Sequence, residues 1–184
     1  MLIQTERMFI RSFKDSDIES FLVYRNIPEV ALYQGWDLPF SREAAVQLVN
    51  EVKEIEIPRV GRWLQLALEL KETHEMIGDI GLRIQSNDPR QAVIGFTIAP
   101  AYWRRGYASE AVTALLGYLF DDLGLHRVSA DCDTENVGSW RTLEKAGFRL
   151  EAHFVENYPI GVRYASEYVY GMLRREWVAR KGQG

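Results

Sequence analysis

The range Ile94–Ala111 contains the residues whose types and spacing could bind a charged ligand. An apolar stretch ends at Pro100, a basic turn with Arg104, Arg105 and Gly106 follows, and a helical pattern begins. The first N–H groups of a helix lack partners within it and carry the positive end of the helix dipole. A glycine lets a ligand approach the backbone, and the arginines add positive charge. These features predict an anion site suited to a pyrophosphate, with a plain strand-to-helix turn as the alternative.

Composition excludes several classes of protein. The formal net charge of −4 shows no basic excess of the kind that nucleic-acid binders have. The one cysteine, Cys132, excludes an intrachain disulfide, and with only three scattered histidines it argues against a metal site. No apolar run approaches the roughly 20 residues that span a bilayer, and no signal-peptide pattern opens the chain. We therefore expect a cytoplasmic protein with no metal, no nucleic-acid partner and no membrane partner.

Short strand-like segments alternate with helical ones, which predicts a single α/β domain over residues 1–184 with a core of about 6–178. Strands are expected at 3–13, 63–70, 76–84, 92–98, 127–132, 148–157 and 165–173. Helices are expected from the capping residues Ser16 and Ser41, over 109–123, and from Asn136 to Gly147. Leucines alternate with polar residues in 63–70, so that strand is expected to be buried on one face only.

The basic turn and its surroundings resemble the GNAT superfamily of N-acetyltransferases. Gly106 and Ala108 match the last two fixed positions of its coenzyme A motif, Gln/Arg-x-x-Gly-x-Gly/Ala, while Trp103 departs from the first. Tyr102 and Trp103 before that glycine are typical of the RimJ/RimL-like branch, which resembles ribosomal-protein N-terminal acetyltransferases. Further segments agree, so that the resemblance covers almost the whole chain in order: Thr5–Phe13, Leu123–Val128, Asp133–Phe148 and Arg174–Trp177.

The resemblance implies a GNAT fold, with a mixed, mostly antiparallel sheet that is splayed at the acetyl-CoA site and flanked by helices. Acetyl-CoA would enter where 92–98 and 127–132 part, and a backbone N–H there could stabilise an oxyanion. Gly95 could allow a bulge at this place, or it could serve tight packing. The residues expected to bind the coenzyme are Phe96, Thr97, Ile98, Trp103, Arg104, Arg105, Gly106, Tyr107, Ala108, Ser109, Asn136 and Ser139.

The resemblance also suggests catalytic roles. Ser139 is expected to be the general acid that protonates the leaving thiolate, although a serine in a first helical turn needs no such reason. Three carboxylates on expected strands are weak candidates for a general base, because such residues are more often solvated strand residues, and Asp79 could instead have a structural role at a bulge: Glu69, Asp79 and Glu156. Tyr33 and Trp36 lie in the region that would line the acceptor side, where Trp36 would either bind substrate or hold its loop in place.

These expectations combine into an enzyme that moves an acetyl group from acetyl-CoA to a primary amine by direct transfer in a ternary complex. The expected acceptor is a protein N-terminal α-amine. One alternative is a small amine such as a polyamine, an amino acid or an aminoglycoside. An alternative of another class is a non-catalytic sensor that binds acyl-CoA. A homodimer is compatible with the resemblance, but nothing in the sequence specifies its interface.

Overall fold

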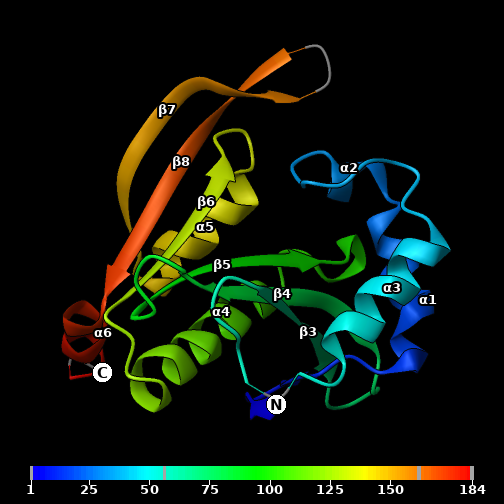
Figure 1. Cartoon of the computed structure of the whole chain (residues 1–184), viewed down its shortest axis with the longest axis horizontal. Coiled ribbons are helices and arrows are strands. Elements are labelled where there is room, and N and C mark those ends of the chain that lie inside the picture. The colour runs from blue at the N-terminus through cyan, green and yellow to red at the C-terminus, as the bar shows by residue number, and fades with distance from the viewer. Residues whose placement is uncertain (1, 56, 161–162, 183–184) are drawn as a thin grey trace.

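The computed structural model describes residues 2–55, 57–160 and 163–182, and it contains an eight-stranded sheet in the order β1-β2-β3-β4-β5-β6-β8-β7 (Figure 1). The strands are β1 (Leu2–Gln4), β2 (Met8–Arg11), β3 (Trp63–Leu70), β4 (Met76–Ile84), β5 (Gln91–Ile98), β6 (Arg127–Asp133), β7 (Arg149–Ile160) and β8 (Arg163–Leu173). Neighbouring strands are antiparallel except β5 and β6, which are parallel. The predicted mixed, mostly antiparallel sheet is therefore confirmed.

Helices connect and flank these strands: α1 (Ile18–Arg25), α2 (Pro28–Ala31), α3 (Arg42–Val52), α4 (Tyr107–Gly117), α5 (Val137–Ala146) and α6 (Arg174–Lys181). Two of the expected helix starts are confirmed by side-chain caps. Ser41 Oγ accepts the Ala44 N–H at 3.1 Å, and Asn136 Oδ1 accepts the Ser139 N–H at 3.2 Å. Within the described ranges, none of these helices is both long enough and apolar enough to cross a membrane.

Several predicted boundaries are wrong for local reasons. The expected strand 3–13 is split by a turn, in which the Thr5 N–H donates to the Met8 carbonyl and the Met8 N–H donates to Thr5 Oγ1, both at 2.9 Å. At the first helix, the capping side chain is that of Asp17, which accepts the Lys14 N–H, and not that of Ser16. A short 3-10 turn precedes Ile18, where the helix begins. The helix expected over 109–123 is α-helical to Gly117 and continues as a π-helical turn. Helix α6 was not expected.

The strand expected to be buried on one face, β3, is buried on both along its second half. Leu66, Ala67, Leu68 and Glu69 point alternately to opposite faces, and all four are buried. The face that contains Glu69 can be buried because the Glu69 carboxylate pairs with Arg11 of β2 and so does not require water. A polar residue in an alternating pattern thus marks a buried ion pair here, not a solvated face.

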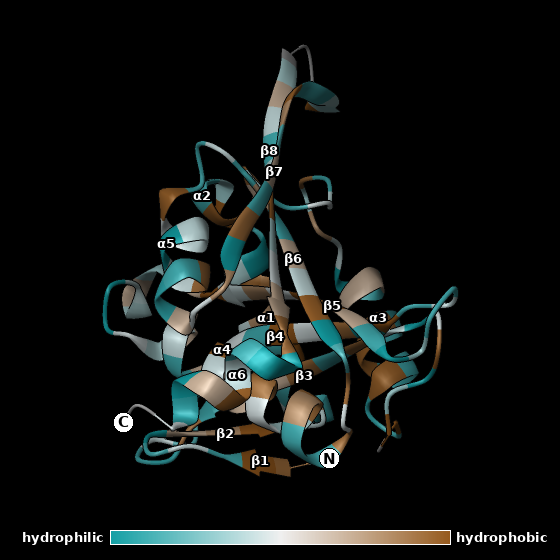
Figure 2. Ribbon diagram, turned by 90° about the vertical axis from the view of Figure 1, so that its left-hand side faces the viewer, coloured by the Kyte–Doolittle hydropathy of each residue, from teal (hydrophilic) through white to brown (hydrophobic). Residues whose placement is uncertain are grey.

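Strands β5 and β6 separate along their length, as the splayed sheet requires. Their pairing covers Gln91 with Arg127, Ala92 with Val128 and Val93 with Ser129, and it stops there. Beyond this point β5 continues to Ile98 and β6 to Asp133 without pairing to each other. We call these two unpaired stretches, 94–98 and 130–133, the fork. On the far side of β6, strands β8 and β7 form a hairpin that projects beyond the body of the sheet (Figures 1 and 2).

Gly95 in the fork and Gly78 on the neighbouring strand differ sharply in their surroundings. A Cβ on Gly78 of β4 would lie 2.2 Å from the Thr97 carbonyl oxygen and 3.0 Å from Ile98 Cα. A Cβ on Gly95 of β5 would meet no atom within 4 Å, and the β4–β5 register runs through it without a shift. Neither a bulge nor tight packing therefore explains Gly95, which borders open space, whereas Gly78 is required by close packing of two strands.

We expect Gly78→Ala to lower the free energy of unfolding by about 2–3 kcal/mol, because an added methyl group collides with backbone that cannot rotate away. Gly95→Ala is the matched control, and its effect should stay within about 1 kcal/mol. Urea unfolding followed by circular dichroism measures both. Equal effects of the two substitutions would contradict the packing described for Gly78.

Candidate active site

The β5 side of the fork offers backbone groups to a ligand. Successive residues of a strand direct their N–H and C=O groups to opposite sides. The Ala99 N–H donates to the Ile77 carbonyl of β4 at 2.8 Å, so the backbone groups of Ile98 and Phe96 point the other way, toward β6. The Ile98 carbonyl accepts a hydrogen bond from Trp103 Nε1 at 2.6 Å. The N–H and C=O groups of Phe96 therefore face the fork. Among the described residues, no strand pairs with them there.

Beyond β5, the basic turn (Trp103–Gly106) has the shape of an anion-binding loop. Its backbone is left-handed at Arg104, with φ 60°, and again at Gly106, with φ 83°. Helix α4 begins at the next residue, Tyr107, so the N–H groups of its first turn have no partner within the helix. Such alternating backbone conformations turn successive N–H groups toward one concavity. The residues fit a pyrophosphate, because exposed N–H groups and two exposed arginines are combined at a helix N-terminus.

The β6 side of the fork contains Ser139 and Cys132. Asn136 caps α5 with its side chain and thereby holds the Ser139 N–H. A hydrogen bond from the Ser139 side chain lowers the pKa of the Cys132 thiol, which is buried on β6 beyond the point of separation. Burial raises the pKa of that thiol to about 11, and the bond from Ser139 only partly opposes the rise. Cys132 is therefore protonated at neutral pH and unsuited to act as a nucleophile.

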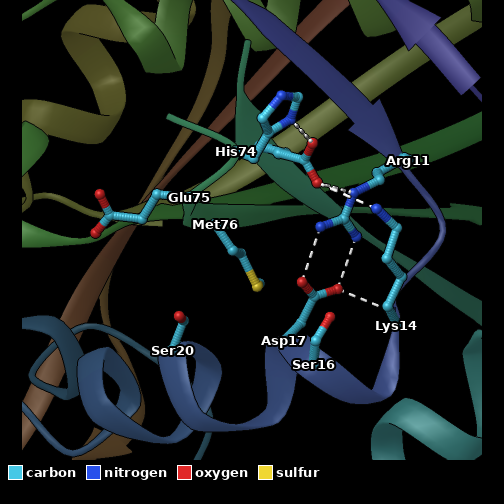
Figure 3. A pocket seen from close by; sticks show the side chains of 9 residues that line it. Arg11, Lys14, Ser16, Asp17, Ser20, His74, Glu75 and Met76 are labelled. Atoms are coloured by element: carbon cyan, nitrogen blue, oxygen red, sulfur yellow. Dashed lines mark hydrogen bonds and ion pairs between the residues drawn. The ribbon is translucent and has the colours of Figure 1, made fainter. Parts of the chain in front are cut away.

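Glu69 lies outside the fork and lines a pocket between β3 and the start of α1. Figure 3 shows Arg11, Lys14, Asp17 and His74, the charged or polar neighbours that line the same pocket. The Glu69 carboxylate is bound by Arg11 Nε at 2.5 Å, His74 Nδ1 at 3.0 Å and Lys14 Nζ at 3.4 Å. Arg11 in turn binds both oxygens of Asp17, at 2.7 and 2.8 Å. Burial alone would raise the pKa of Glu69, but the bonds from His74 and Arg11 outweigh it and lower that pKa to about 2. A carboxylate with this pKa is a poor proton acceptor.

Asp79, the second base candidate, is fully buried in β4. It accepts hydrogen bonds from the Tyr24 hydroxyl and from Gln65 Nε2, the latter at 2.5 Å, and Arg25 Nη2 lies 3.5 Å away. Burial and the nearby Asp79 charge raise the pKa of Tyr24 well above its ordinary value, so the phenol stays protonated as the donor. These partners favour a structural role for Asp79.

Glu156, the third base candidate, lies on the projecting hairpin. It is exposed, it adopts a left-handed conformation with φ 47°, and its N–H donates to Ser166 Oγ at 3.0 Å. The β7–β8 register shifts between Phe154 and Tyr158, so Glu156 belongs to a bulge. Its conformation therefore has a structural explanation.

Trp36 and Tyr33 lie in the segment after α2. Trp36 Nε1 donates to the Arg25 carbonyl at 3.0 Å, and the Arg25 guanidinium carbon lies 4.0 Å from the centre of the indole. Phe40 packs against the same indole, with ring centres 6.3 Å apart. These contacts favour the reading in which Trp36 holds its loop in place. Tyr33 is half-buried nearby.

Asp131 and Glu167 were missed by the sequence reasoning. Asp131 precedes Cys132 in β6, so its side chain points to the face opposite Ser139 and α5. Although part of the residue is exposed, desolvation raises the pKa of its carboxyl, and the charge of Arg83 only partly opposes this. Glu167 of β8 has a pKa raised by burial and by the Asp131 charge. The sequence did contain a signal for Asp131. Successive side chains of a strand point to opposite faces, so Asp131 and the buried Cys132 lie on opposite faces of β6.

Comparison with known proteins identifies the class of transferase to which this fold belongs. The model of the acetyltransferase (GNAT) domain matches residues 7–149. The uncharacterized N-acetyltransferase YoaA of Bacillus subtilis is 34% identical over 151 residues, covering 82% of this chain and 84% of that protein. The chain belongs to the GNAT acetyltransferase family. It is an N-acetyltransferase of a family that uses acetyl-CoA.

Solved structures show the same fold. The crystal structure of a GNAT-family acetyltransferase from Bacillus anthracis is 31% identical, with a TM-score of 0.83, and the match covers 95% of this chain and 99% of that one. The spermidine N-acetyltransferase of Vibrio cholerae, solved with CoA and spermine, has a TM-score of 0.79 at 22% identity, with 93% and 98% covered. At that identity the second likeness concerns the fold alone.

We expect Glu69→Gln to destabilise the protein by about 3 kcal/mol at pH 7, since an ionised group with a lowered pKa stabilises the folded state. The pKa of Glu69 is about 2 when folded against an ordinary 4.5. Its contribution is therefore complete above about pH 4.5 and is lost as the pH falls toward 2. Urea unfolding at several pH values should show the deficit of the variant shrinking over this window. The exposed Glu72→Gln in the same hairpin is the control, and a deficit that is independent of pH would refute the assignment.

Proposed function

We propose that this protein acetylates a protein N-terminal α-amine, in the manner of the RimJ/RimL-like branch that its motif resembles. The observation that carries the proposal is the fork beside the basic turn, combined with the closed networks around Glu69 and Asp79. The fork and turn accommodate a pyrophosphate-bearing thioester. Because Glu69 and Asp79 are bound within these networks, neither carboxylate is available as a base for the acceptor amine.

Which amine the protein can acetylate depends on whether these carboxylates can take up the proton of the amine. An α-amine with a pKa of about 8 is roughly a tenth neutral at pH 7, whereas a lysine amine is less than about a thousandth neutral. Glu69, with a pKa of about 2, is a poor base, and both carboxylate oxygens of Asp79 already accept hydrogen bonds from Tyr24 and Gln65. An acceptor that needs little deprotonation suits such a site better than a lysine side chain does.

The coenzyme site uses backbone groups more than side chains. The N–H groups of Tyr107, Ala108 and Ser109, with Arg104 and Arg105, would hold the pyrophosphate. The backbone of Phe96 and Ile98, with Thr97 between them and Asn136 across the fork, would border the pantetheine arm, which is amide-rich like a peptide. Bound acetyl-CoA supplies the activated thioester.

Ser139 is proposed as the general acid that returns a proton to the leaving sulfur. Two observations support this: Asn136 accepts its N–H, and its side chain lowers the pKa of Cys132, which lies on β6 beyond the point where the strands separate. The Cys132 thiol, with a pKa of about 11, is a poor candidate for a covalent intermediate, which supports direct transfer to the amine.

A small cationic amine is the second candidate acceptor, favoured by Asp131 and Glu167. Both carboxylates lie on strands that border or adjoin the fork, and a cationic amine would relieve their mutual repulsion. Desolvation also makes Asp131 a better proton acceptor than Glu69. A non-catalytic acyl-CoA sensor would have the coenzyme site without any acceptor.

Thiol release from acetyl-CoA, measured against a panel of short peptides, polyamines and aminoglycosides, should be fastest with peptides that have free N-termini. Blocking the N-terminus should abolish it. Thiol release with polyamines or aminoglycosides alone would replace the proposal by the small-amine candidate. Asp131→Asn would then be expected to raise the KM for these cationic amines. Coenzyme binding without release toward any amine would favour the sensor.

We expect Ser139→Ala to lower kcat about tenfold to a hundredfold, at the modest end for a general acid because a thiol is already a fair leaving group. Thr142→Ala on the same helix is the control, since its hydroxyl donates to the Gly138 carbonyl at an exposed position. Steady-state kinetics with saturating acetyl-CoA gives the comparison. Unchanged turnover in Ser139→Ala would remove Ser139 from the mechanism.

A further inference from the structure

Arg7, in the turn between β1 and β2, reaches helix α4 and the basic turn from a remote part of the chain. Its main-chain N–H donates to Glu110 Oε1 at 2.9 Å, and its Nε donates to Glu110 Oε2 at 2.7 Å. Its Nη1 donates to the Arg105 carbonyl at 3.0 Å. Its guanidinium carbon also lies 4.3 Å from the centre of the Tyr107 ring. One side chain thus contacts residues on both sides of Gly106.

The bond to Arg105 fixes the direction of the next N–H group. In a trans peptide the C=O and the following N–H point in opposite directions. Because the Arg105 carbonyl points to Arg7, the Gly106 N–H points away from Arg7. A Cβ on Gly106 would lie 3.5 Å from Arg7 Nη2, so the arginine also packs along the left-handed glycine. Arg7 therefore determines how this part of the turn presents its donors.

The pair with Glu110 removes an unfavourable charge. A free carboxylate near the start of α4 would repel a bound phosphate and compete for its donors. Burial would raise the pKa of Glu110, but hydrogen bonds from Thr5 and from the Arg7 backbone and side chain outweigh it and lower the pKa. Glu110 is therefore ionised, and Arg7 both neutralises it and holds it on the side of β1 and β2.

We propose that Arg7 is a positioning residue for the pyrophosphate of acetyl-CoA, although it lies outside the coenzyme motif. It acts through the Arg105 peptide and the Glu110 carboxylate, which it holds so that the turn keeps its left-handed form and its donors stay available. This rests on the proposed coenzyme site. It makes the N-terminal hairpin, at the opposite edge of the sheet from β7, a determinant of coenzyme affinity.

The test compares two thioesters that differ in the pyrophosphate. With Arg7→Ala, kcat/KM for acetyl-CoA should fall about tenfold or more, through a higher KM. With S-acetyl-pantetheine, which has no pyrophosphate, kcat/KM should change less than about twofold. Arg90→Ala, which removes an exposed arginine paired with Asp88, should leave both unchanged. Arg7→Lys keeps one charge but not the forked donors, so it should restore only part of the loss.

Calorimetric titration with CoA separates this inference from the proposed function, since it needs no acceptor. If the unmodified protein does not bind CoA, the proposed function fails. If it binds CoA and Arg7→Ala binds equally well, or if the variant loses both thioesters equally, the role of Arg7 is refuted. Should Arg7→Ala not fold, Arg7→Lys provides the same comparison, with an expected loss of about threefold to tenfold for acetyl-CoA alone.

Discussion

Hydrogen bonding between β5 and β6 stops after three residue pairs, and this leaves both strands with backbone groups that a continuous sheet would have used. Unpaired backbone groups are costly when buried, so such an opening persists only where the chain supplies other partners or where a ligand enters. Trp103 supplies one partner by binding the Ile98 carbonyl. Among the described residues, no strand pairs with the backbone groups of Phe96 on this side of β5. The fork is therefore an interruption of regular structure that local contacts stabilise.

The carboxylates nearest the α1 side of the sheet stabilise the fold. Arg11 links Asp17 at the start of α1 to Glu69 of β3, and Tyr24 of α1 donates to Asp79 of β4. Ion pairs of this kind are expensive to break once buried, because the remaining charge has no water to replace its partner. They fix α1 on the sheet and, with it, the loop that contains Trp36. In the proposed mechanism, the acid-base chemistry is consequently left to groups near the fork.

Sequence reasoning predicted most of the fold but only part of the site. The apolar period and the caps at Ser41 and Asn136 located the helices, because these signals are local. Burial of Glu69 and Asp79 could not be foreseen, since their partners are distant in sequence and a polar residue in a strand ordinarily predicts solvent. Contact between Arg7 and Glu110 spans a still longer separation. That Asp131 and the buried Cys132 point to opposite faces of β6 could be predicted, because side chains alternate along a strand.

The state of Cys132 has a practical consequence for the study of this enzyme. It is the chain's one cysteine, it is buried, and its thiol has a pKa of about 11. Disulfide reagents and maleimides react with exposed thiolates, so the folded protein should consume almost none of either. A colour reaction for released coenzyme thiol then has little background from the protein. A cysteine introduced on the projecting β7–β8 hairpin could likewise carry a fluorophore without removal of the native residue.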